Sequence, residues 1–191
     1  LAPLNDKLSN LTHDNTFIVL HMIGSHGPTY FKRYPQDKRT FTPDCPRSDI
    51  QNCTDEALIN TYDNTIAYTD YVLNEVIALL KQSAVAAELN TSLLYISDHG
   101  ESLGENGIYL HGLPYSFAPD SQTHVPMLLW ADNETTDLDL GCIAQAKRTR
   151  MSHDNVFDML LGMMSVTSVS YDQNNDPFAS CHLSAIVAQQ F

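Results

Sequence analysis

Apolar runs and amphipathic segments alternate along the chain. Residues 16–22 (TFIVLHM), 92–97 (SLLYIS) and 125–130 (VPMLLW) are apolar runs of the length of a buried strand. Residues 55–82 carry a helical apolar stripe, and residues 153–164 form a second amphipathic helix. The order strand, helix, strand, strand, helix predicts an α/β layered fold with a largely parallel sheet.

The two predicted helices have recognisable start signals. Thr54 can cap the long helix, and Asp55 and Glu56 suit the positive end of its dipole. Ser152 can cap the shorter helix. The residues expected on the buried stripe of the long helix are Leu58, Tyr62, Ile66, Leu73, Ile77 and Leu80.

Two of the predicted strands end in polar loops that are rich in glycine and histidine. Residues 21–27 follow the first strand, and residues 98–107 follow the second. Ligands of parallel sheets bind beyond the carboxyl ends of the strands. We therefore expect both loops to open on one edge of the sheet and to form a functional site.

The first candidates for metal binding in these loops are Asp98 and His99. Zinc accepts both carboxylate oxygen and imidazole nitrogen. Adjacent strand residues point to opposite faces, but Gly100 lets the backbone turn so that both side chains could face one ion. A polar strand exit, with Asp98 capping the next turn, is an equally good interpretation of these three residues.

Two further histidines lie in loops flanked by glycine. His26 stands in GSHGP, and His111 follows His99 by twelve residues in YLHGLP. A lone histidine is more often a packed or surface residue than a ligand, so only these two pass as site candidates. Packing roles are favoured for His21 and His124, and the remaining candidates, His13 and His182, are given no site role.

Charge is unevenly distributed around these loops. Asp98, Glu101 and Glu105 are three carboxylates within eight residues, and they repel one another unless a cation or a donor compensates them. The alternative is that the two glutamates simply face water, which suits Glu105 better.

A basic cluster follows His26. It holds four of the ten Lys and Arg residues of the chain and could attract an anionic substrate. Without other evidence, we favour the alternative that these residues belong to a solvated loop and only balance the charge of the chain. Its members are Lys32, Arg33, Lys38 and Arg39.

Composition narrows the function further. With 191 residues, 43% of them apolar and 17% charged, we expect residues 1–191 to form one domain with a core. The net charge of −13 argues against nucleic acid as a partner. No apolar run reaches the ~20 residues of a membrane helix. The chain begins without Met, so we interpret it as a piece of a longer protein, in which a membrane segment could still lie.

Four cysteines occur, and none forms a C-x-x-C pair. Cys45 and Cys53 bracket a short polar loop, whereas Cys142 and Cys181 lie further apart. Disulfides in an oxidising compartment and reduced cysteines in a cytosolic protein fit the composition about equally well.

Five segments of the chain are informative when they are taken together. They are HMIGSHGPTYFKRYP, FTPDC, YDNTIAYTDYVLNEVIALLK, LLYISDHGESLGENGIYLHGLPYSFAP and QTHVPMLLW. Together they resemble the phosphoethanolamine transferases that modify lipid A, which belong to the alkaline phosphatase and sulfatase superfamily. The resemblance spans roughly residues 16–164, and the mobile colistin-resistance enzymes belong to this group.

The resemblance implies a three-layer α/β/α fold and a zinc-dependent reaction. In the family, a zinc-activated threonine takes phosphoethanolamine from phosphatidylethanolamine and passes it to lipid A. The catalytic domain is periplasmic and is tethered to the inner membrane by an N-terminal domain, and the activity gives polymyxin resistance. A membrane contact through such a domain is therefore expected.

Individual residues match family positions. Asp98 and His99 match two zinc ligands, and His26 and His111 match catalytic histidines that contact the phosphoryl group or a further zinc. Glu101 is a weaker match, as a group beside the substrate or behind a metal ligand, and Lys32 and Arg33 are weak substrate-side candidates. Cys45 and Cys53 match a family disulfide, whereas a bond between Cys142 and Cys181 follows from parity alone.

The resemblance also predicts what this piece lacks. The first strand of the family fold, its acidic zinc ligand and the helix that carries the threonine precede Leu1. We therefore expect the C-terminal part of a sulfatase-like catalytic domain, inactive alone. The alternatives are a sulfatase or phosphodiesterase-type hydrolase of the same superfamily, or a non-catalytic metal-binding fragment.

Overall fold

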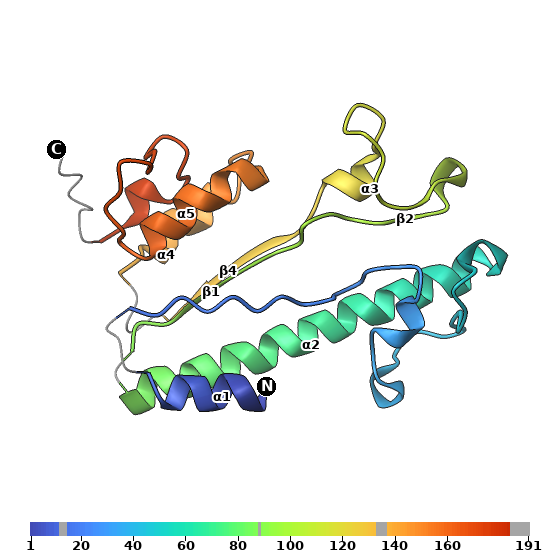
Figure 1. The fold of residues 1–191 in the computed structure, drawn as a ribbon, viewed down its shortest axis with the longest axis horizontal. Helices are drawn as coiled ribbons and strands as arrows, with labels where there is room; N and C mark the ends of the chain where they lie inside the picture. Colours follow the sequence, from blue (N-terminus) through green and yellow to red (C-terminus); the bar gives the residue numbers. More distant parts are fainter. Residues whose placement is uncertain (12–14, 88, 133–136, 184–191) are drawn as a thin grey trace. The chain divides into compact units, whose positions relative to one another are not determined.

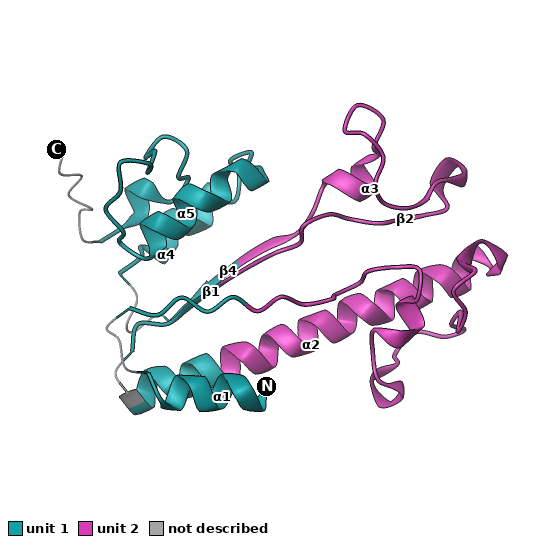
Figure 2. Ribbon diagram, in the orientation of Figure 1, with its two compact units in different colours: residues 1–19, 79–93, 129–191 teal, residues 20–78, 94–128 magenta. Residues whose placement is uncertain are grey.

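The computed structural model describes residues 1–11, 15–87, 89–132 and 137–183. His13 lies outside these residues. The chain forms two compact units (Figure 2). Unit 1 comprises residues 1–19, 79–93 and 129–191, and unit 2 comprises residues 20–78 and 94–128.

The long helix α2 runs from Asp55 to Ala87 (Figure 1), which confirms the predicted helix. Thr54 caps it, since Oγ1 of Thr54 accepts the N–H of Ala57 at 3.2 Å. The predicted stripe is only partly right, because Leu58 is buried but Ile66 is 47% exposed. Polar residues occupy much of the buried face instead, namely Thr61, Asn64, Thr65 and Thr69.

These buried polar side chains attach the irregular segment 30–53 to the helix. Oδ1 of Asn64 accepts the N–H groups of Thr40 and Phe41 at 2.7 and 2.8 Å, and its Nδ2 donates to the Phe41 carbonyl at 2.9 Å. Oγ1 of Thr61 accepts the N–H of Cys45 at 2.6 Å. Buried backbone groups need such partners. The segment itself contains the short 3₁₀ helices Tyr30–Lys32, Gln36–Lys38 and Ile50–Asn52.

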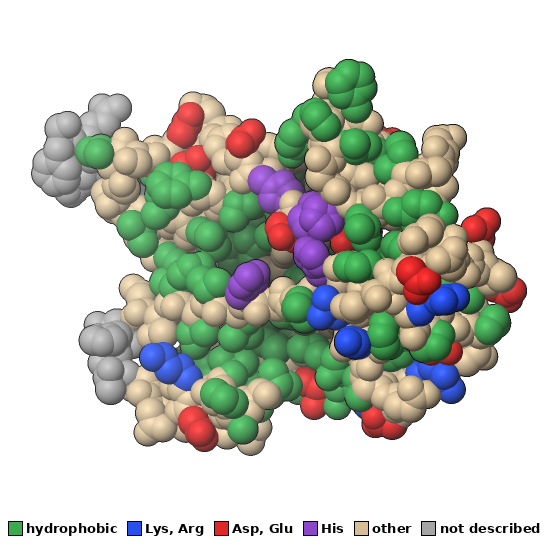
Figure 3. Space-filling view, turned by 45° about the vertical axis from the view of Figure 1, so that its right-hand side comes forward, with side chains coloured by type: hydrophobic (Ala, Val, Ile, Leu, Met, Phe, Trp, Pro, Cys, Tyr) green, Lys and Arg blue, Asp and Glu red, His purple; other side chains and the backbone are tan. Residues whose placement is uncertain are grey.

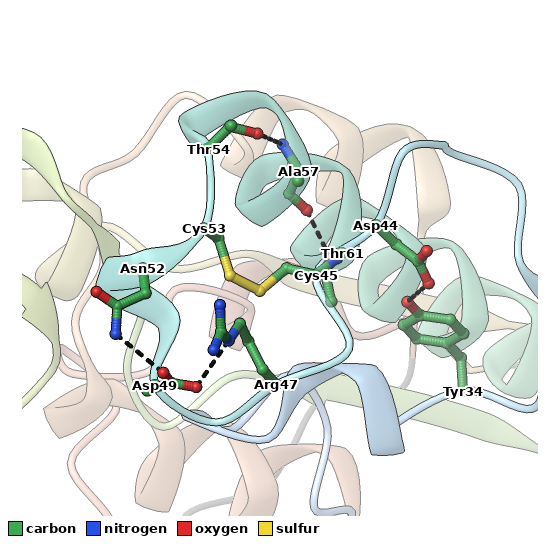
Figure 4. Close-up of a disulfide and its surroundings, with 10 residues drawn as sticks. All are labelled: Tyr34, Asp44, Cys45, Arg47, Asp49, Asn52, Cys53, Thr54, Ala57 and Thr61. Atoms are coloured by element: carbon green, nitrogen blue, oxygen red, sulfur yellow. Dashed lines mark hydrogen bonds and ion pairs between the residues drawn. A yellow bond between two sulfur atoms is a disulfide. The ribbon is translucent and has the colours of Figure 1, made fainter.

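Cys45 and Cys53 form a disulfide beside the start of α2 (Figure 4), as the family resemblance implied. Their Cα atoms lie 6.0 Å apart. The loop that the disulfide closes is further braced by Asp49, whose carboxylate accepts hydrogen bonds from Arg47 and Asn52 at 2.8 and 2.9 Å.

Two of the three predicted strands are present. β1 (Ser92–Ile96) and β4 (Met127–Ala131) are neighbours in a two-stranded sheet. Hydrogen bonds join Ser97 to Pro126 at one end and Asp132 to Thr91 at the other, which makes the pair antiparallel. β2 (Ser102–Leu103) and β3 (Tyr109–Leu110) form a second, antiparallel pair.

The predicted strand at residues 16–22 is wrong for the described chain, because this segment has no ladder partner among the described residues. It is irregular and largely exposed, as Phe17 at 56% and Val19 at 72% show. A β-strand needs a neighbouring strand to satisfy its backbone groups. For the same reason, the expected parallel sheet is not seen in the described residues, whose strand pairs are both antiparallel.

Unit 1 contains the shorter helices α1 (Ala2–Ser9), α4 (Leu140–Ala146) and α5 (Val156–Met163). The predicted helix at 153–164 is confirmed as the 3₁₀ turn His153–Asn155 followed by α5, and Ser152 forms a capping box with Asn155. Cys142 of α4 is bonded to Cys181 of the 3₁₀ turn Ala179–Cys181, so the second disulfide is confirmed as well. No helix among the described residues is long and apolar enough to cross a membrane.

Candidate metal centre

The centre lies in unit 2, where β1 ends and the chain turns at Gly100. The N–H of Gly100 donates to the Gln122 carbonyl at 2.9 Å, next to the short helix α3 (Asp120–Thr123). A Cβ atom at Gly100 would collide with the backbone oxygen of Ser121. Only glycine permits this close approach, which fixes the position of His99 beside it.

Three histidines from three separate loops meet here. The rings of His99 and His111 stack with centroids 3.8 Å apart, and the ring of His26 lies 4.9 Å from that of His111 and 5.8 Å from that of His99. One nitrogen of each ring lies within 4.8 Å of the others. Figure 3 shows several histidine side chains on one face, with Lys and Arg side chains beside them.

Each of the three rings has its Nδ1 atom next to an acceptor. The acceptors are the carbonyl of Gly27 at 2.7 Å from His26, the carbonyl of Gly100 at 3.0 Å from His99, and Oε1 of Glu101 at 3.1 Å from His111. Carbonyl and carboxylate oxygens accept but do not donate, so each Nδ1 carries the proton. In the neutral form of each ring, Nε2 then keeps a lone pair, which is the state in which histidine binds metal.

Glu101 is the buried centre of the hydrogen bonds behind the rings. Its side chain is 3% exposed. Oε1 accepts the N–H of Gly27 at 3.0 Å as well as the Nδ1–H of His111, and Oε2 accepts the hydroxyl of Tyr30 at 3.1 Å. Three donors compensate the buried charge, so Glu101 does not face water. A substrate-side role for Glu101 stays a prediction.

Gly27 and Tyr30 are packed tightly around this carboxylate. A Cβ atom at Gly27 would lie 2.6 Å from the Tyr30 hydroxyl and 2.6 Å from a methyl group of Leu110. Burial, followed by the charge of Glu101, raises the pKa of Tyr30 well above its ordinary range. The same two causes raise the pKa of Tyr62 to about 12. Both hydroxyls therefore stay protonated, and Tyr30 remains a hydrogen-bond donor.

Asp98 lies at the edge of the group. Its side chain is 84% exposed, and its Oδ2 is 3.8 Å from Nε2 of His99. Its Oδ1 accepts the N–H of the adjacent His99 at 3.1 Å. A carboxylate oxygen beside a free Nε2 is compatible with a shared ion, so the role of Asp98 as a ligand stays a prediction.

The four basic residues of the cluster have different surroundings. Arg33 donates from Nε to the carbonyl of His26 at 2.8 Å, which places its guanidinium next to the histidine group. Arg39 is paired with Asp44 at 3.1 Å, and Nζ of Lys38 lies 3.8 Å from the centre of the Tyr71 ring. Lys32 is exposed. Lys32 and Arg33 thus remain the substrate-side candidates.

Several residues around the site have structural roles that sequence reasoning missed. Ser102 is completely buried and is bonded to Gln122 and Ser121, and Oγ of Ser97 donates to the carbonyl of His99 at 2.8 Å. Glu105 is exposed and accepts the N–H of Leu103 at 2.8 Å. In the sequence, the only sign of these roles is that Ser97 and Ser102 flank the candidate ligands Asp98 and His99.

Comparison with known proteins shows the family to which the chain belongs. The family model described as Sulfatase matches residues 1–166. The chain belongs to the sulfatase family. It is 50% identical, over 93% of its length, to "Phosphoethanolamine transferase EptA" of Escherichia coli (strain K12). It is 40% identical, over 88% of its length, to "Phosphatidylethanolamine transferase Mcr-1" of Escherichia coli.

Solved structures of this sulfatase-family group agree with the fold. The C-terminal periplasmic domain of phosphoethanolamine transferase EptC from Campylobacter jejuni superposes with a TM-score of 0.86 at 48% identity, over 93% of this chain and 55% of that one. The soluble domain of lipooligosaccharide phosphoethanolamine transferase A from Neisseria meningitidis gives 0.80 at 44% identity, over 85% of this chain and 49% of that one.

The chain is shorter than these relatives. It spans 33% of the Escherichia coli EptA and 30% of Mcr-1.

Proposed function

We propose that this chain is the C-terminal part of the catalytic domain of a phosphoethanolamine transferase. The enzyme would take phosphoethanolamine from phosphatidylethanolamine and transfer it to lipid A. The observation that carries the proposal is the group of three histidines, each with Nδ1 next to an acceptor and each with one ring nitrogen within 4.8 Å of the others. The names of the relatives at 40–50% identity supply the chemistry of the transferred group.

The residues present fit a zinc ion. Imidazole Nε2 atoms and a carboxylate oxygen are ligands that zinc accepts, and each ring is held by a second hydrogen bond of the kind found behind zinc-bound histidines. Asp98 and His99 would hold the ion. When bound, zinc polarises phosphoryl oxygens and makes a hydroxyl nucleophile more acidic. That hydroxyl would belong to a threonine outside this chain, which would carry the phosphoethanolamine covalently between donor and acceptor.

The other residues would act on the phosphoryl group. His26 and His111 would stabilise the negative charge that develops on its oxygens, or protonate the oxygen that leaves. In each ring the hydrogen bond of Nδ1 fixes the direction of Nε2, so the group is oriented before the substrate arrives. A further zinc between these two histidines is compatible with the same geometry. Lys32 and Arg33 would attract the anionic headgroups of the two lipids.

The fold and location follow from the same proposal. A three-layer α/β/α domain, with a mostly parallel sheet, would be completed by a strand and a helix outside residues 1–191. The structural relatives include periplasmic domains and an integral membrane protein. We therefore place this domain at the periplasmic face of the inner membrane, held there by a membrane domain, with polymyxin resistance as the result of lipid A modification.

A hydrolase of the same family is the second candidate, because the matching family model is that of the sulfatases. Transferase and hydrolase differ in whether lipid A or water receives the phosphoethanolamine. The deciding experiment expresses the intact protein in a strain with unmodified lipid A and measures modified lipid A and free phosphoethanolamine by mass spectrometry. We expect modified lipid A with the native protein and with the His21→Ala control, and none with His111→Ala. Release of free phosphoethanolamine without any modified lipid A would overturn the assignment.

A further inference from the structure

Tyr30 is the residue beside the centre to which the proposed reaction gives no role. It is 1% exposed and begins the 3₁₀ turn Tyr30–Lys32. Its ring packs edge-on against Tyr62 with centroids 5.5 Å apart, and its hydroxyl donates to Oε2 of Glu101 at 3.1 Å. It lies four residues after His26, so one short segment supplies both a candidate active-site ring and this hydroxyl.

The two oxygens of Glu101 have different partners. Oε1 accepts from Gly27 and from His111, whereas the only donor to Oε2 among the described residues is Tyr30. The terminal torsion of a glutamate side chain has a broad and weak preference of its own. The Tyr30 hydroxyl is therefore the contact that holds the Oε2 side of the carboxylate, and it helps to set the direction of Oε1.

The direction of Oε1 matters for His111. Its Nδ1–H is bonded to Oε1 at 3.1 Å, and this bond fixes both the tautomer and the rotation of the ring. The N–H of Gly27 is bonded to the same oxygen, which keeps the His26 loop against the His111 loop. The Tyr30 hydroxyl can thus influence the direction of Nε2 of His111 through Glu101, without a direct contact with His111.

We propose that Tyr30 is a positioning residue, which orients His111 through Glu101 so that Nε2 of His111 faces a zinc ion held by the histidine group. The proposal rests on the proposed function only in that the histidine group binds zinc. It assigns Tyr30 no contact with substrate and no proton transfer. Its effect should be passed on through His111.

The test is the zinc affinity of the intact protein, measured by competition with a chromophoric chelator. Tyr30→Phe removes the hydroxyl and keeps the buried ring. We expect this variant to bind zinc up to about 10-fold more weakly, because a loss of about 10–100-fold is usual for the group bonded directly to a metal ligand, here Glu101, and Tyr30 acts through that group. Tyr62→Phe is the matched control, because it makes the same change in the same aromatic pair, where the structure describes no hydrogen bond from that hydroxyl to Glu101. We expect it to change the affinity less than twofold.

A double-mutant cycle with His111→Ala separates positioning from a general structural effect. If Tyr30 acts through His111, then Tyr30→Phe adds little to the loss already caused by His111→Ala. Equal affinities of Tyr30→Phe and the native protein, or fully additive losses in the cycle, would overturn the proposal. If Tyr30→Phe is not folded at the assay temperature, Glu101→Gln takes its place in the cycle, with the same expectation and the same contradicting result.

This test is independent of the transfer reaction. It uses zinc and the chelator, without lipid, so a protein that proves to be a hydrolase would still show the coupling between Tyr30 and His111. Conversely, an intact transferase without this coupling would disprove the role of Tyr30 and leave the proposed function standing.

Discussion

His111 and Glu101 are joined by a hydrogen bond of 3.1 Å between Nδ1 and Oε1, and the carboxylate is almost completely buried while the ring is 31% exposed. The bond therefore joins a buried carboxylate to a ring that is partly exposed at the surface. A buried acceptor thus determines which nitrogen an exposed ring presents to a ligand. Much of the site depends on such bonds.

Gly27→Ala should destabilise the protein. The added methyl group would lie 2.6 Å from the Tyr30 hydroxyl and 2.6 Å from Leu110, and Tyr30 is too buried to move away freely. We expect a loss of about 1–3 kcal/mol in the free energy of unfolding, the range for overpacked cores. Chemical denaturation measures it. Gly141→Ala, in helix α4, is the control, because its methyl group meets only the Asp139 side chain at 3.1 Å. Equal stability of the Gly27→Ala and native proteins would contradict this packing.

Asn64→Ala should detach the segment around Thr40 from helix α2. The substitution leaves two backbone N–H groups and one carbonyl without the partner that they have now. Each unsatisfied buried group costs about 1–3 kcal/mol, less where water can enter, so we expect a total loss of about 2–4 kcal/mol. Asn74→Ala, at an exposed position of the same helix, should change the free energy of unfolding by less than about 0.5 kcal/mol. Similar effects of the two substitutions would be inconsistent with the anchoring role.

Helix α2 also shows where hydrophobic periodicity succeeds and where it fails. The pattern predicted the helix, its cap at Thr54 and the burial of Leu58. It placed Ile66 inside, although Asn64 and Thr65 are the buried residues and Ile66 is 47% exposed. Polar side chains are buried here because they bind the backbone of a distant loop, and periodicity contains no information about such partners.

The site was predictable to a similar degree. Their glycine-flanked positions singled out His26 and His111, and the structure brings both beside His99. The burial of Glu101 and its bond to Tyr30 were not predictable, since they depend on packing between residues 71 positions apart. The strand expected at residues 16–22 failed for a related reason: an apolar run becomes a strand only beside a partner, and no strand pairs with it in the described part of the chain.

Reversing the charges of Lys32 and Arg33 should slow transfer at low ionic strength. Lys32→Glu/Arg33→Glu replaces two cations beside the His26 loop with anions, which would repel anionic headgroups. We expect the rate to fall about tenfold or more at low salt, and the difference from the native protein to shrink as salt is added. Lys147→Glu/Arg148→Glu, an adjacent exposed basic pair in unit 1, is the control. Unchanged transfer at low salt would remove the role of the cluster.

The two disulfides should contribute unequally to stability. They are separated by 8 residues for Cys45–Cys53 and by 39 residues for Cys142–Cys181. From loop length alone, we expect losses of about 2.5 kcal/mol for the shorter loop and about 4 kcal/mol for the longer one. Chemical denaturation of the Cys45→Ser/Cys53→Ser and Cys142→Ser/Cys181→Ser variants measures the difference. A larger loss for the shorter loop would show that strain or native contacts outweigh loop entropy.

The most direct test of the account is the zinc content of the intact protein after purification, measured by elemental analysis. The account predicts that the native protein and the His124→Ala control retain zinc, and that Asp98→Ala/His99→Ala loses most of it, because these substitutions remove one Nε2 and the carboxylate beside it. Equal zinc in the double variant and the native protein would contradict the assignment of this site as the metal centre.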